Sequence, residues 1–402
     1  MDLKATTFTT TSTICVLLGV IALPLDTTAY WTGSSGVALL STKGRSSSSV
    51  ISRGVSNSRS GARGGLGGKP AARATWSMTA GTSKRARRTQ NAQGNLFVDE
   101  SCIDCDTCRW MQGDTFFSVD GKSAVARQPE TEEEKRGAYR AMFACPTNSI
   151  RLETADPAAK AALNDFPYPV APELFSGIFH TGFHAEESFG CSPWLVQRTG
   201  GNVLMDSPRF TASLAGAIEK MGGVSWMVLS HIDDVGDHER WKKRFPEMRR
   251  VMHKADVQSQ GDTGNVEVQL DSDTADGSID GFEFWDLAED LRVLHTPGHS
   301  MGSITLLYRP SSSGNDGTEW DGAVAFTGDH VGLSGRTGAL TGFSRYGYDL
   351  NLQSKSMELL ARPDIPFRWI LPGHGRKIRF TSDQERMSQI KIAATKVKDR
   401  RD

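Results

Sequence analysis

Apolar and polar positions alternate along the C-terminal two thirds of the chain in a way that predicts both strands and helices. Residues 210–221 have apolar side chains at helical spacing and end at Gly222, a residue type that commonly terminates helices. The apolar run just after this helix is predicted to deliver His231 at its carboxyl end, where open α/β sheets place ligand-binding side chains. Short apolar runs predict four strands, over 177–182, 194–197, 202–205 and 224–229.

The remainder of the chain divides where this pattern changes. Residues 95–153 combine short apolar segments with four cysteines, and residues 154–172 are rich in Ala and Pro, which predicts a linker. Two later stretches, 255–287 and 310–321, are dominated by Gly, Ser and Asp and predict surface insertions. The pattern therefore predicts a small domain over 95–153 and a larger one over 173–395.

The first 94 residues are predicted to be a presequence rather than a folded domain. Lys4 precedes an apolar run over 14–25 and small residues over 27–29, the order found in a secretory signal peptide. The run is too short to span a bilayer core of about 30 Å, so no stable membrane insertion is expected. Residues 30–94 are rich in Ser, Gly, Arg and Ala and predict a disordered, transit-like segment after a signal peptide over about residues 1–29.

Charge sets this presequence apart from the rest of the chain. Residues 27–98 contain eleven Lys or Arg and no Asp or Glu. Residues 1–98 carry twelve basic and two acidic side chains, or +10, so the remainder must carry −11 to give the net charge of −1. A basic tail on an acidic body favours targeting over a nucleic-acid surface, so no nucleic-acid partner is expected.

A signal peptide followed by an acid-free, Ser- and Arg-rich stretch resembles the two-part presequence that imports proteins into plastids of secondary origin. Tyr30 and Trp31, directly after the expected cleavage point, are similar to the aromatic residue that such presequences carry there. The resemblance implies a plastid (chloroplast) location, with secretion as the alternative. The cysteine chemistry of the next segment argues against secretion, because thiolate ligands are poorly suited to an oxidising compartment.

Four of the six cysteines are spaced for a metal cluster rather than for disulfides. Cys102, Cys105 and Cys108 lie three residues apart, and Cys145 follows 37 residues later, next to Pro146. Three thiolates at this spacing can wrap a short loop around one face of a cubane, and a remote fourth completes the set. With no second triplet in the sequence, the four predict a single [4Fe–4S] cluster. A zinc site is the alternative, although zinc cysteines usually come as two pairs.

The segments around these cysteines, NLFVDESCIDCDTCRWM and AMFACPTNSI, resemble the two halves of a single-cluster ferredoxin. The resemblance implies a ferredoxin-like domain over 95–153, in which each half supplies a short strand, a cluster loop and a turn. Between the halves, residues 129–144 predict a helix whose charged residues face solvent. Trp110 and Met111 are expected either to shield the cluster from water or to pack in the core.

The chemistry of the larger domain is concentrated in four stretches, each of which follows an apolar run and so forms a loop at a strand end. They are SHIDDVGDH over 230–238, HTPGHSMGS over 295–303, FTGDH over 326–330 and LPGHG over 371–375. Together and in this order they resemble the metallo-β-lactamase superfamily. The resemblance implies a four-layer αββα sandwich. The fold class expected for the chain is therefore α+β, with a small ferredoxin-like domain followed by this sandwich.

The resemblance also implies a two-metal site. By that resemblance His299, Asp329 and His374 are metal ligands, with Asp329 bridging the two metals. Such a site can lower the pKa of a water and hold hydroxide for attack on a substrate. Imidazoles favour Zn or Fe, and an extra carboxylate shifts the preference towards Mn or Fe, so the expected cofactors are two divalent metals of these kinds.

The first of the four stretches departs from the superfamily's usual His-x-His-x-Asp-His. Asp233 stands where the second His is usual, and two residues are inserted before Asp237 and His238. The resemblance implies that His231, Asp237 and His238 are metal ligands, with Asp233 as a further candidate and Asp234 as a weaker one. Asp237 is also the candidate catalytic residue, because it could orient the nucleophile.

The other histidines are expected to support the site or the core. His253 is expected to be structural. His295 and His330 are expected to be structural or to support the ligands, with direct contact to metal or substrate as the alternative. His180 and His184 resemble the opening strand of the subgroup in which a ferredoxin module precedes this domain, and packing is their expected role.

Three functions follow from these assignments. The first is a hydrolase that attacks an ester, thioester, amide or phosphodiester of a small-molecule substrate. The second is a redox enzyme in which the iron–sulfur domain supplies electrons to a di-iron site, with an electron-transfer partner. Asp233 motivates this second reading, because di-iron flavoproteins of the same superfamily carry a carboxylate there. The third is an electron carrier or scaffold with a degenerate metal site. A β-lactam substrate is not expected.

Overall fold

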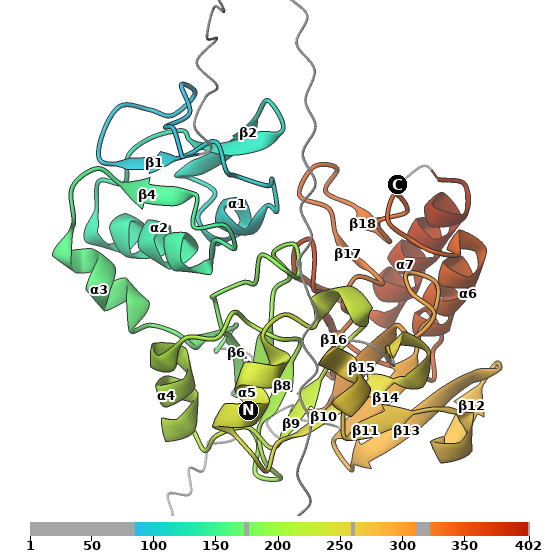
Figure 1. Ribbon diagram of the computed structural model, residues 1–402. Coiled ribbons are helices and arrows are strands. Elements are labelled where there is room, and N and C mark those ends of the chain that lie inside the picture. Colours follow the sequence, from blue (N-terminus) through green and yellow to red (C-terminus); the bar gives the residue numbers. More distant parts are fainter. Residues whose placement is uncertain (1–84, 173–176, 259–261, 311–321, 401–402) are drawn as a thin grey trace, which may run out of the picture. The chain divides into compact units, whose positions relative to one another are not determined.

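The computed structural model describes residues 85–172, 177–258, 262–310 and 322–400 (Figure 1). The expected signal peptide, the transit-like segment up to residue 84 and most of the stretch 310–321 lie outside the described residues. Residues Ser77–Asp402 form one compact unit, which contains a small domain followed by a larger one. Within the described ranges, no helix combines the length and the apolar character that crossing a membrane requires.

The small domain is built from two strand pairs and two helices. β1 pairs with β4 and β2 with β3, both antiparallel. Thr131 and Glu134 form a reciprocal capping box that starts α2 inside the predicted stretch 129–144. The elements are β1 (Leu96–Val98), α1 (Thr107–Met111), β2 (Phe116–Val119), β3 (Lys122–Val125), α2 (Glu132–Ala144) and β4 (Ile150–Leu152).

The small domain extends beyond both of its predicted boundaries. Residues 85–94, predicted to end a disordered presequence, are folded against it: the buried Asn91 accepts hydrogen bonds from Val98 N at 2.9 Å and Val125 N at 3.0 Å. The predicted linker 154–172 contains a helix, α3 (Pro157–Leu163), whose alanines pack on the small domain's core. The segment is rich in Ala and Pro, as linkers are, but Asp156 caps a helix there by accepting a hydrogen bond from Ala158 N.

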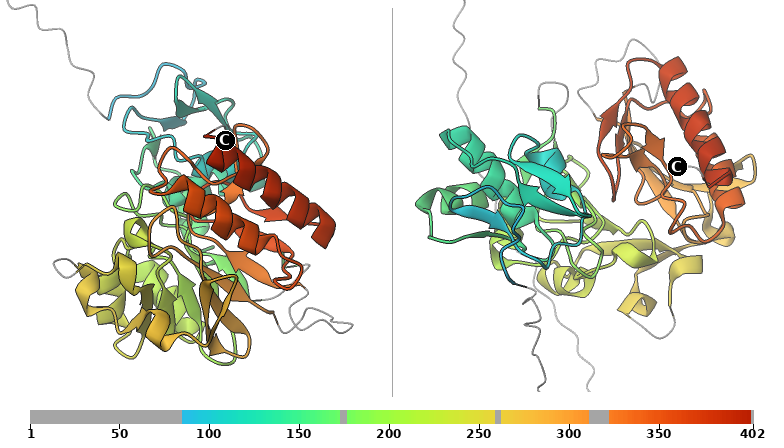
Figure 2. Two further views of the ribbon diagram at one scale, coloured as in Figure 1. Left: turned by 90° about the vertical axis from the view of Figure 1, so that its right-hand side faces the viewer. Right: turned by 90° about the horizontal axis from the view of Figure 1, so that it is seen from above.

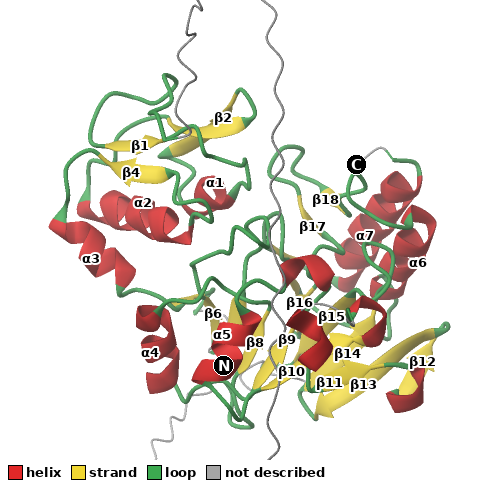
Figure 3. Cartoon of the chain, viewed as in Figure 1, coloured by secondary structure: helices red, strands yellow, loops and turns green. Residues whose placement is uncertain are grey.

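The larger domain is a sandwich of two sheets. Within the described residues each sheet has seven strands, and Figure 3 shows the strands in yellow between helices in red. The first sheet comprises β5 (Tyr168–Pro169), β6 (Ile178–His180), β7 (Trp194–Val196), β8 (Val203–Met205), β9 (Trp226–Val228), β10 (Arg249–His253) and β11 (Val268–Leu270). The second comprises β12 (Gly277–Ile279), β13 (Phe282–Ala288), β14 (Leu291–His295), β15 (Ile304–Tyr308), β16 (Val324–Phe326), β19 (Trp369–Leu371) and β20 (Ile378–Arg379).

Three buried layers hold the sandwich together. Side chains such as Val228 and Phe326 meet between the inner faces of the sheets. On the outer faces, α4 (Ala212–Lys220) and α5 (His238–Arg244) cover the first sheet, and α6 (Leu350–Leu360) and α7 (Asp383–Lys398) cover the second. Figure 2 shows α6 and α7 side by side in red. These layers confirm the predicted αββα sandwich.

The predicted strands and helix around 177–229 are confirmed as β6 to β9 and α4. The predicted surface insertion over 255–287 is wrong, because it supplies β11 to the first sheet and β12 and most of β13 to the second. Gly and Asp are frequent there because short strands alternate with turns and 3₁₀ helices (η), η2 (Lys254–Asp256), η3 (Asp262–Asn265) and η4 (Ser272–Thr274). A hairpin of β17 (Gly332–Leu333) and β18 (Leu340–Thr341) precedes α6.

Candidate metal centre and iron–sulfur site

Four strand ends bring the candidate metal ligands together. β9 leads to His231, β14 to His299, β16 to Asp329 and β19 to His374. Because β16 and β19 are parallel neighbours, the loops at their carboxyl ends lie side by side. Strands from both sheets therefore contribute to one site at the edge of the sandwich.

Asp329 is shared by two groups of candidate ligands. Its Oδ2 lies 3.9 Å from His231 Nε2 and 3.7 Å from His299 Nε2. Its Oδ1 lies 2.7 Å from His374 Nδ1, and Asp234 completes that second group. One carboxylate that presents a different oxygen to each group has the geometry of a bridge between two metals.

A short 3₁₀ helix, η1 (Ile232–Asp234), directs two neighbouring carboxylates to different places. Asp233 is half-exposed, and its Oδ2 lies 3.9 Å from His231 Nε2, beside the first group. Asp234 is fully buried in the second group, together with Asp329 and His374. The residue type at position 233 therefore adds a carboxylate to the first group, and Asp234 takes a place that the sequence had favoured less.

Several buried polar atoms in this site fit a metal. Among the described residues, neither carboxylate oxygen of Asp234 has a hydrogen-bond partner, and the same holds for His231 Nε2. An unsatisfied buried polar atom is costly, and coordination to a cation would remove that cost. Burial lowers the pKa of His231 to about 3, so its imidazole is neutral, which is the form that binds metals. The donors are imidazoles and carboxylates, a set that suits Zn, Fe or Mn.

The charges of the second group are tightly coupled. Burial alone would raise the pKa of Asp329, but the neighbouring His374, His231 and His299 hold it well below its usual value. Burial likewise opposes protonation of His374, yet Asp329 raises its pKa to about 10. Without a metal, His374 and Asp329 therefore form a partly buried ion pair at neutral pH, and a metal would replace the proton on His374.

Two predicted ligands lie elsewhere. Asp237 Oδ2 accepts a hydrogen bond from Phe210 N at 2.7 Å and pairs with Arg240 at the start of α5. His238 lies inside α5, where its Nδ1 accepts a hydrogen bond from the Arg250 guanidinium at 3.0 Å. In contrast to the prediction, the structure brings neither residue into the groups around Asp329. The inserted residues and η1 start α5 too late for its first residues to face the centre.

Two residues that the sequence did not single out lie next to the second group. Asp206 directly follows β8, and its Oδ1 accepts a hydrogen bond from Ser230 N at 2.7 Å, which holds the loop that carries His231. Its Oδ2 lies 3.7 Å from Cys191 Sγ. Asp206 has the signal of a strand-end carboxylate and could have been found. Cys191, isolated in sequence, carried no such signal.

The remaining histidines of the described residues lie outside the ligand groups around Asp329. His295 hydrogen bonds to Met301 O at 3.0 Å, lies 3.1 Å from Glu283 and stacks on His253 with ring centroids 4.0 Å apart. His330 is buried, and burial lowers its pKa to about 3. His180 and His184 pack against each other with their Nε2 atoms 2.7 Å apart.

The four cysteines of the small domain line one pocket. Backbone amides point at two of the sulfurs, from Ser123 N to Cys102 Sγ at 3.4 Å and from Ser149 N to Cys145 Sγ at 3.3 Å. Burial, and then the neighbouring Cys145, raises the pKa of Cys105 to about 12. Four thiols, of which Cys108 and Cys145 are buried, therefore line one pocket, which fits ligation of a cationic iron–sulfur core.

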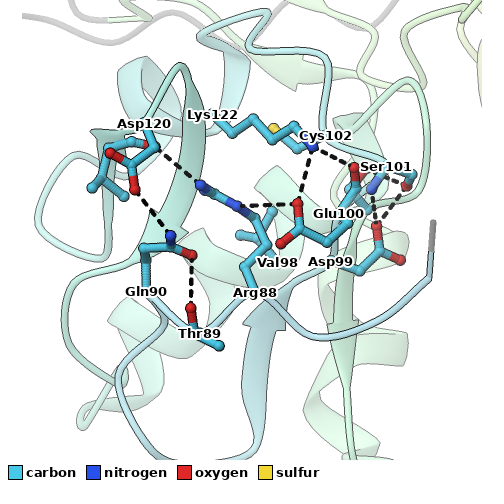
Figure 4. A network of polar contacts seen from close by, with 12 residues as sticks. Arg88, Thr89, Gln90, Val98, Asp99, Glu100, Ser101, Cys102, Asp120 and Lys122 are labelled. Atoms are coloured by element: carbon cyan, nitrogen blue, oxygen red, sulfur yellow. Dashed lines mark hydrogen bonds and ion pairs between the residues drawn. The ribbon is translucent and has the colours of Figure 1, made fainter. Parts of the chain in front are cut away.

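A polar network fixes the chain where it enters this pocket (Figure 4). The buried Asp99 accepts hydrogen bonds from Ser101 N at 2.9 Å and from the Ser101 hydroxyl. Lys122 binds both the carbonyl and the carboxylate of Glu100, at 2.6 and 3.0 Å. These contacts hold the residues just before Cys102, so the cluster loop begins from a defined position.

Residues 98–152 match the family model described as the 4Fe-4S single cluster domain of ferredoxin I. This segment is a ferredoxin-type iron–sulfur domain. The match contains the whole Cys102–Cys108 triplet and Cys145, and it confirms the resemblance drawn from the sequence.

The chain is also similar to solved metallo-β-lactamases. FIM-1 from Pseudomonas aeruginosa, in its mono-zinc form, is 18% identical with a TM-score of 0.36, over 52% of this chain and 84% of that one. Rm3 metallo-β-lactamase is 15% identical with a TM-score of 0.38, over 57% and 91%. At such TM-scores the fold assignment rests on the two sheets and their helical layers. No curated protein matches the chain.

The ferredoxin-type domain contacts the loops of the candidate metal centre. Asp106, in the cluster loop, accepts hydrogen bonds at 2.8 and 3.1 Å from Arg376, which lies two residues after His374. Gly190 packs so closely on Cys105 that an added side-chain carbon would lie 2.9 Å from the Cys105 Cβ. Trp110 packs on His180, with ring centroids 5.0 Å apart. The cluster loop and the metal loops are therefore neighbours.

Proposed function

We propose that the chain is a metal-dependent hydrolase with a dinuclear centre. The observation that supports this most directly is Asp329, which presents one oxygen to His231 and His299 and the other to His374. When bound, two divalent metals supply an activated water for attack on an ester, a thioester or a phosphodiester of a small-molecule substrate.

The chain's own residues prepare this chemistry in three ways. Burial keeps His231 neutral, so it can donate an electron pair at Nε2. Asp206 holds the backbone of the His231 loop through Ser230. Asp233 lies beside His231 and is half-exposed, so it is our candidate to accept a proton from the attacking water. It replaces Asp237 as our candidate for that role.

Metal analysis of anaerobically purified protein tests the proposal. About four irons and two zincs per chain would support the hydrolase. About six irons without zinc would favour the second candidate, a redox enzyme in which the ferredoxin-type domain exchanges electrons with a di-iron centre. The close packing of Gly190 on Cys105 favours that candidate, because it places the cluster loop directly against the metal loops. Four irons and no other metal would remove both.

We also propose that the presequence directs the protein to a plastid. Its support is the sequence alone: an apolar run followed by an acid-free, basic stretch. A fluorescent protein fused to residues 1–95 should enter plastids. Appearance of that fusion in the medium would show secretion instead.

A further inference from the structure

Each of the two ligand groups around Asp329 contains three donors, and the first has a further carboxylate, Asp233, directly beside it. The second group has only Asp234, Asp329 and His374. His238, which the sequence pattern offered as a further ligand, is held by Arg250 in α5. Zinc in proteins is usually four-coordinate, so the second group leaves one position for a water, a substrate or a further protein ligand.

Cys191 lies next to this second group. It is buried, and Cys191, Asp206 and Asp234 form a third cluster whose ligand atoms all lie within 4.8 Å of one another. Asp234 belongs to both this cluster and the second group, and its two buried oxygens have no hydrogen-bond partner among the described residues. The sulfur and the group around Asp329 therefore face the same unsatisfied carboxylate.

Gly373 shows that the donors converge on one point. A side-chain carbon added there would lie 3.0 Å from Cys191 Sγ, 3.0 Å from Asp234 Oδ2 and 2.9 Å from Asp329 Oδ1. Three donors from three separate loops thus surround a position that the absent side chain of Gly373 leaves open. His374, the next residue, adds its imidazole from the same loop.

The loop that carries Cys191 is fixed in this place. Ser192 N donates to Gly373 O at 2.7 Å, and Cys191 N donates to Ser188 O at 2.8 Å. These backbone hydrogen bonds hold the loop of Cys191 against the loop that carries Gly373 and His374.

We propose that Cys191 is the fourth protein ligand of the second metal, together with Asp234, Asp329 and His374. The inference rests on the proposed dinuclear centre. On binding, the thiol releases its proton to solvent and the thiolate forms the bond to the metal. Carboxylates bind zinc, iron and manganese, whereas a thiolate favours zinc or ferrous iron over manganese. Cys191 as a ligand would therefore select against manganese at the second metal position.

Zinc K-edge X-ray absorption tests this without relying on activity. The full chain is loaded with zinc while its iron–sulfur cluster is intact, which is checked by an iron content of about four. The zinc edge does not report the cluster iron. One Cys191 ligand shared over two zincs predicts a shell of about half a sulfur per zinc at about 2.3 Å, outside the nitrogen and oxygen shell at about 2.0–2.2 Å. Cys191→Ser should remove that shell, and Ser192→Ala, a matched change on the same buried loop, should keep it.

The possible outcomes distinguish the role of Cys191 as a ligand from the proposed dinuclear centre. About two zincs without a sulfur shell would overturn the role of Cys191 and leave the dinuclear centre standing. Failure to bind zinc would overturn the dinuclear centre itself. A sulfur shell that persists in Cys191→Ser would also overturn the inference, because the sulfur would then come from another cysteine. The wild-type spectrum answers the question even if the Cys191→Ser protein proves unstable.

Discussion

The ferredoxin-type pocket and the candidate metal centre bury acidic groups in one compact unit, but they balance the charge differently. In the pocket all four candidate ligands are thiols, and burial raises the pKa of Cys105, Cys108 and Cys145. The centre contains both carboxylates and imidazoles, and the charges of Asp329 and His374 partly neutralise each other. The ligand set of the pocket therefore contains no basic partner, whereas the centre retains an ion pair of its own.

This difference predicts which of the two sites keeps its structure when its cluster or its metals are lost. Without a cluster, the sulfurs of the pocket are weak hydrogen-bond acceptors, as in the contacts from Ser123 N to Cys102 and from Ser149 N to Cys145. The metal centre keeps the His374–Asp329 pair and the Asp206–Ser230 hydrogen bond. We expect loss of the cluster to perturb the small domain more than loss of the metals perturbs the sandwich.

The largest expected effect is on the cluster. Cys105→Ser should abolish the visible absorption of the cluster and leave about two metals bound in the sandwich, because their ligands belong to other loops. Metal content and absorption are measured on the same sample. Ser118→Ala, at an exposed position of β2, serves as the control and should change neither. Loss of both metal types in Cys105→Ser would break the comparison, because it would show that the two sites are not independent.

A large effect is also expected at the centre. His299→Ala removes a ligand that faces Asp329 Oδ2, and it should lower hydrolysis of a generic ester or thioester on the order of 100-fold or more. His295→Ala is the matched control, since His295 stacks on His253 instead of joining a ligand group. Unchanged turnover in His299→Ala would remove the proposed role of the centre.

The two sites also differ in how far the sequence predicted them. The four cluster ligands were predictable because three of them lie within one short loop, where spacing alone restricts the geometry. His299, Asp329 and His374 were expected as ligands because the motifs TPGHS, FTGDH and LPGHG resemble those of the metallo-β-lactamase superfamily, and each motif follows an apolar run.

The loop after β9 was different. The 3₁₀ turn η1 and the start of α5 decide which of its aspartates, Asp233, Asp234 or Asp237, faces the centre. The spacing of residues in the sequence determines neither the turn nor the start of the helix. Cys191 lies far from the motifs in sequence and reaches the centre only through the packing of its loop on Gly373. Tertiary contacts of this kind leave no local pattern.

A moderate effect is expected from pH on the metal-free centre. Asp329 raises the pKa of His374 to about 10 in the folded state, against about 6.5 for an unfolded histidine. A raised pKa stabilises the fold fully below the unfolded value, and this contribution is lost as the pH rises towards 10. Denaturant unfolding of metal-free protein should therefore show stability falling between about pH 6.5 and 10. His374→Gln should flatten this slope, and a slope unchanged in that variant would rule out the ion pair as its source.

The smallest expected effect is at the contact between the two sites. Arg376 binds Asp106 with two hydrogen bonds at a partly buried position, and this pair holds the cluster loop against the loop of His374. Arg376→Ala should cost about 1 kcal/mol in the free energy of unfolding, since the pair is bidentate but still reached by water. Arg379→Ala, an exposed arginine on the adjacent strand β20, should cost less. The cluster absorption should remain in both variants, because neither residue is a ligand. If Arg376→Ala bleached the cluster, the pocket would depend on the sandwich for its shape, and the two sites would form one folding unit rather than two neighbouring ones.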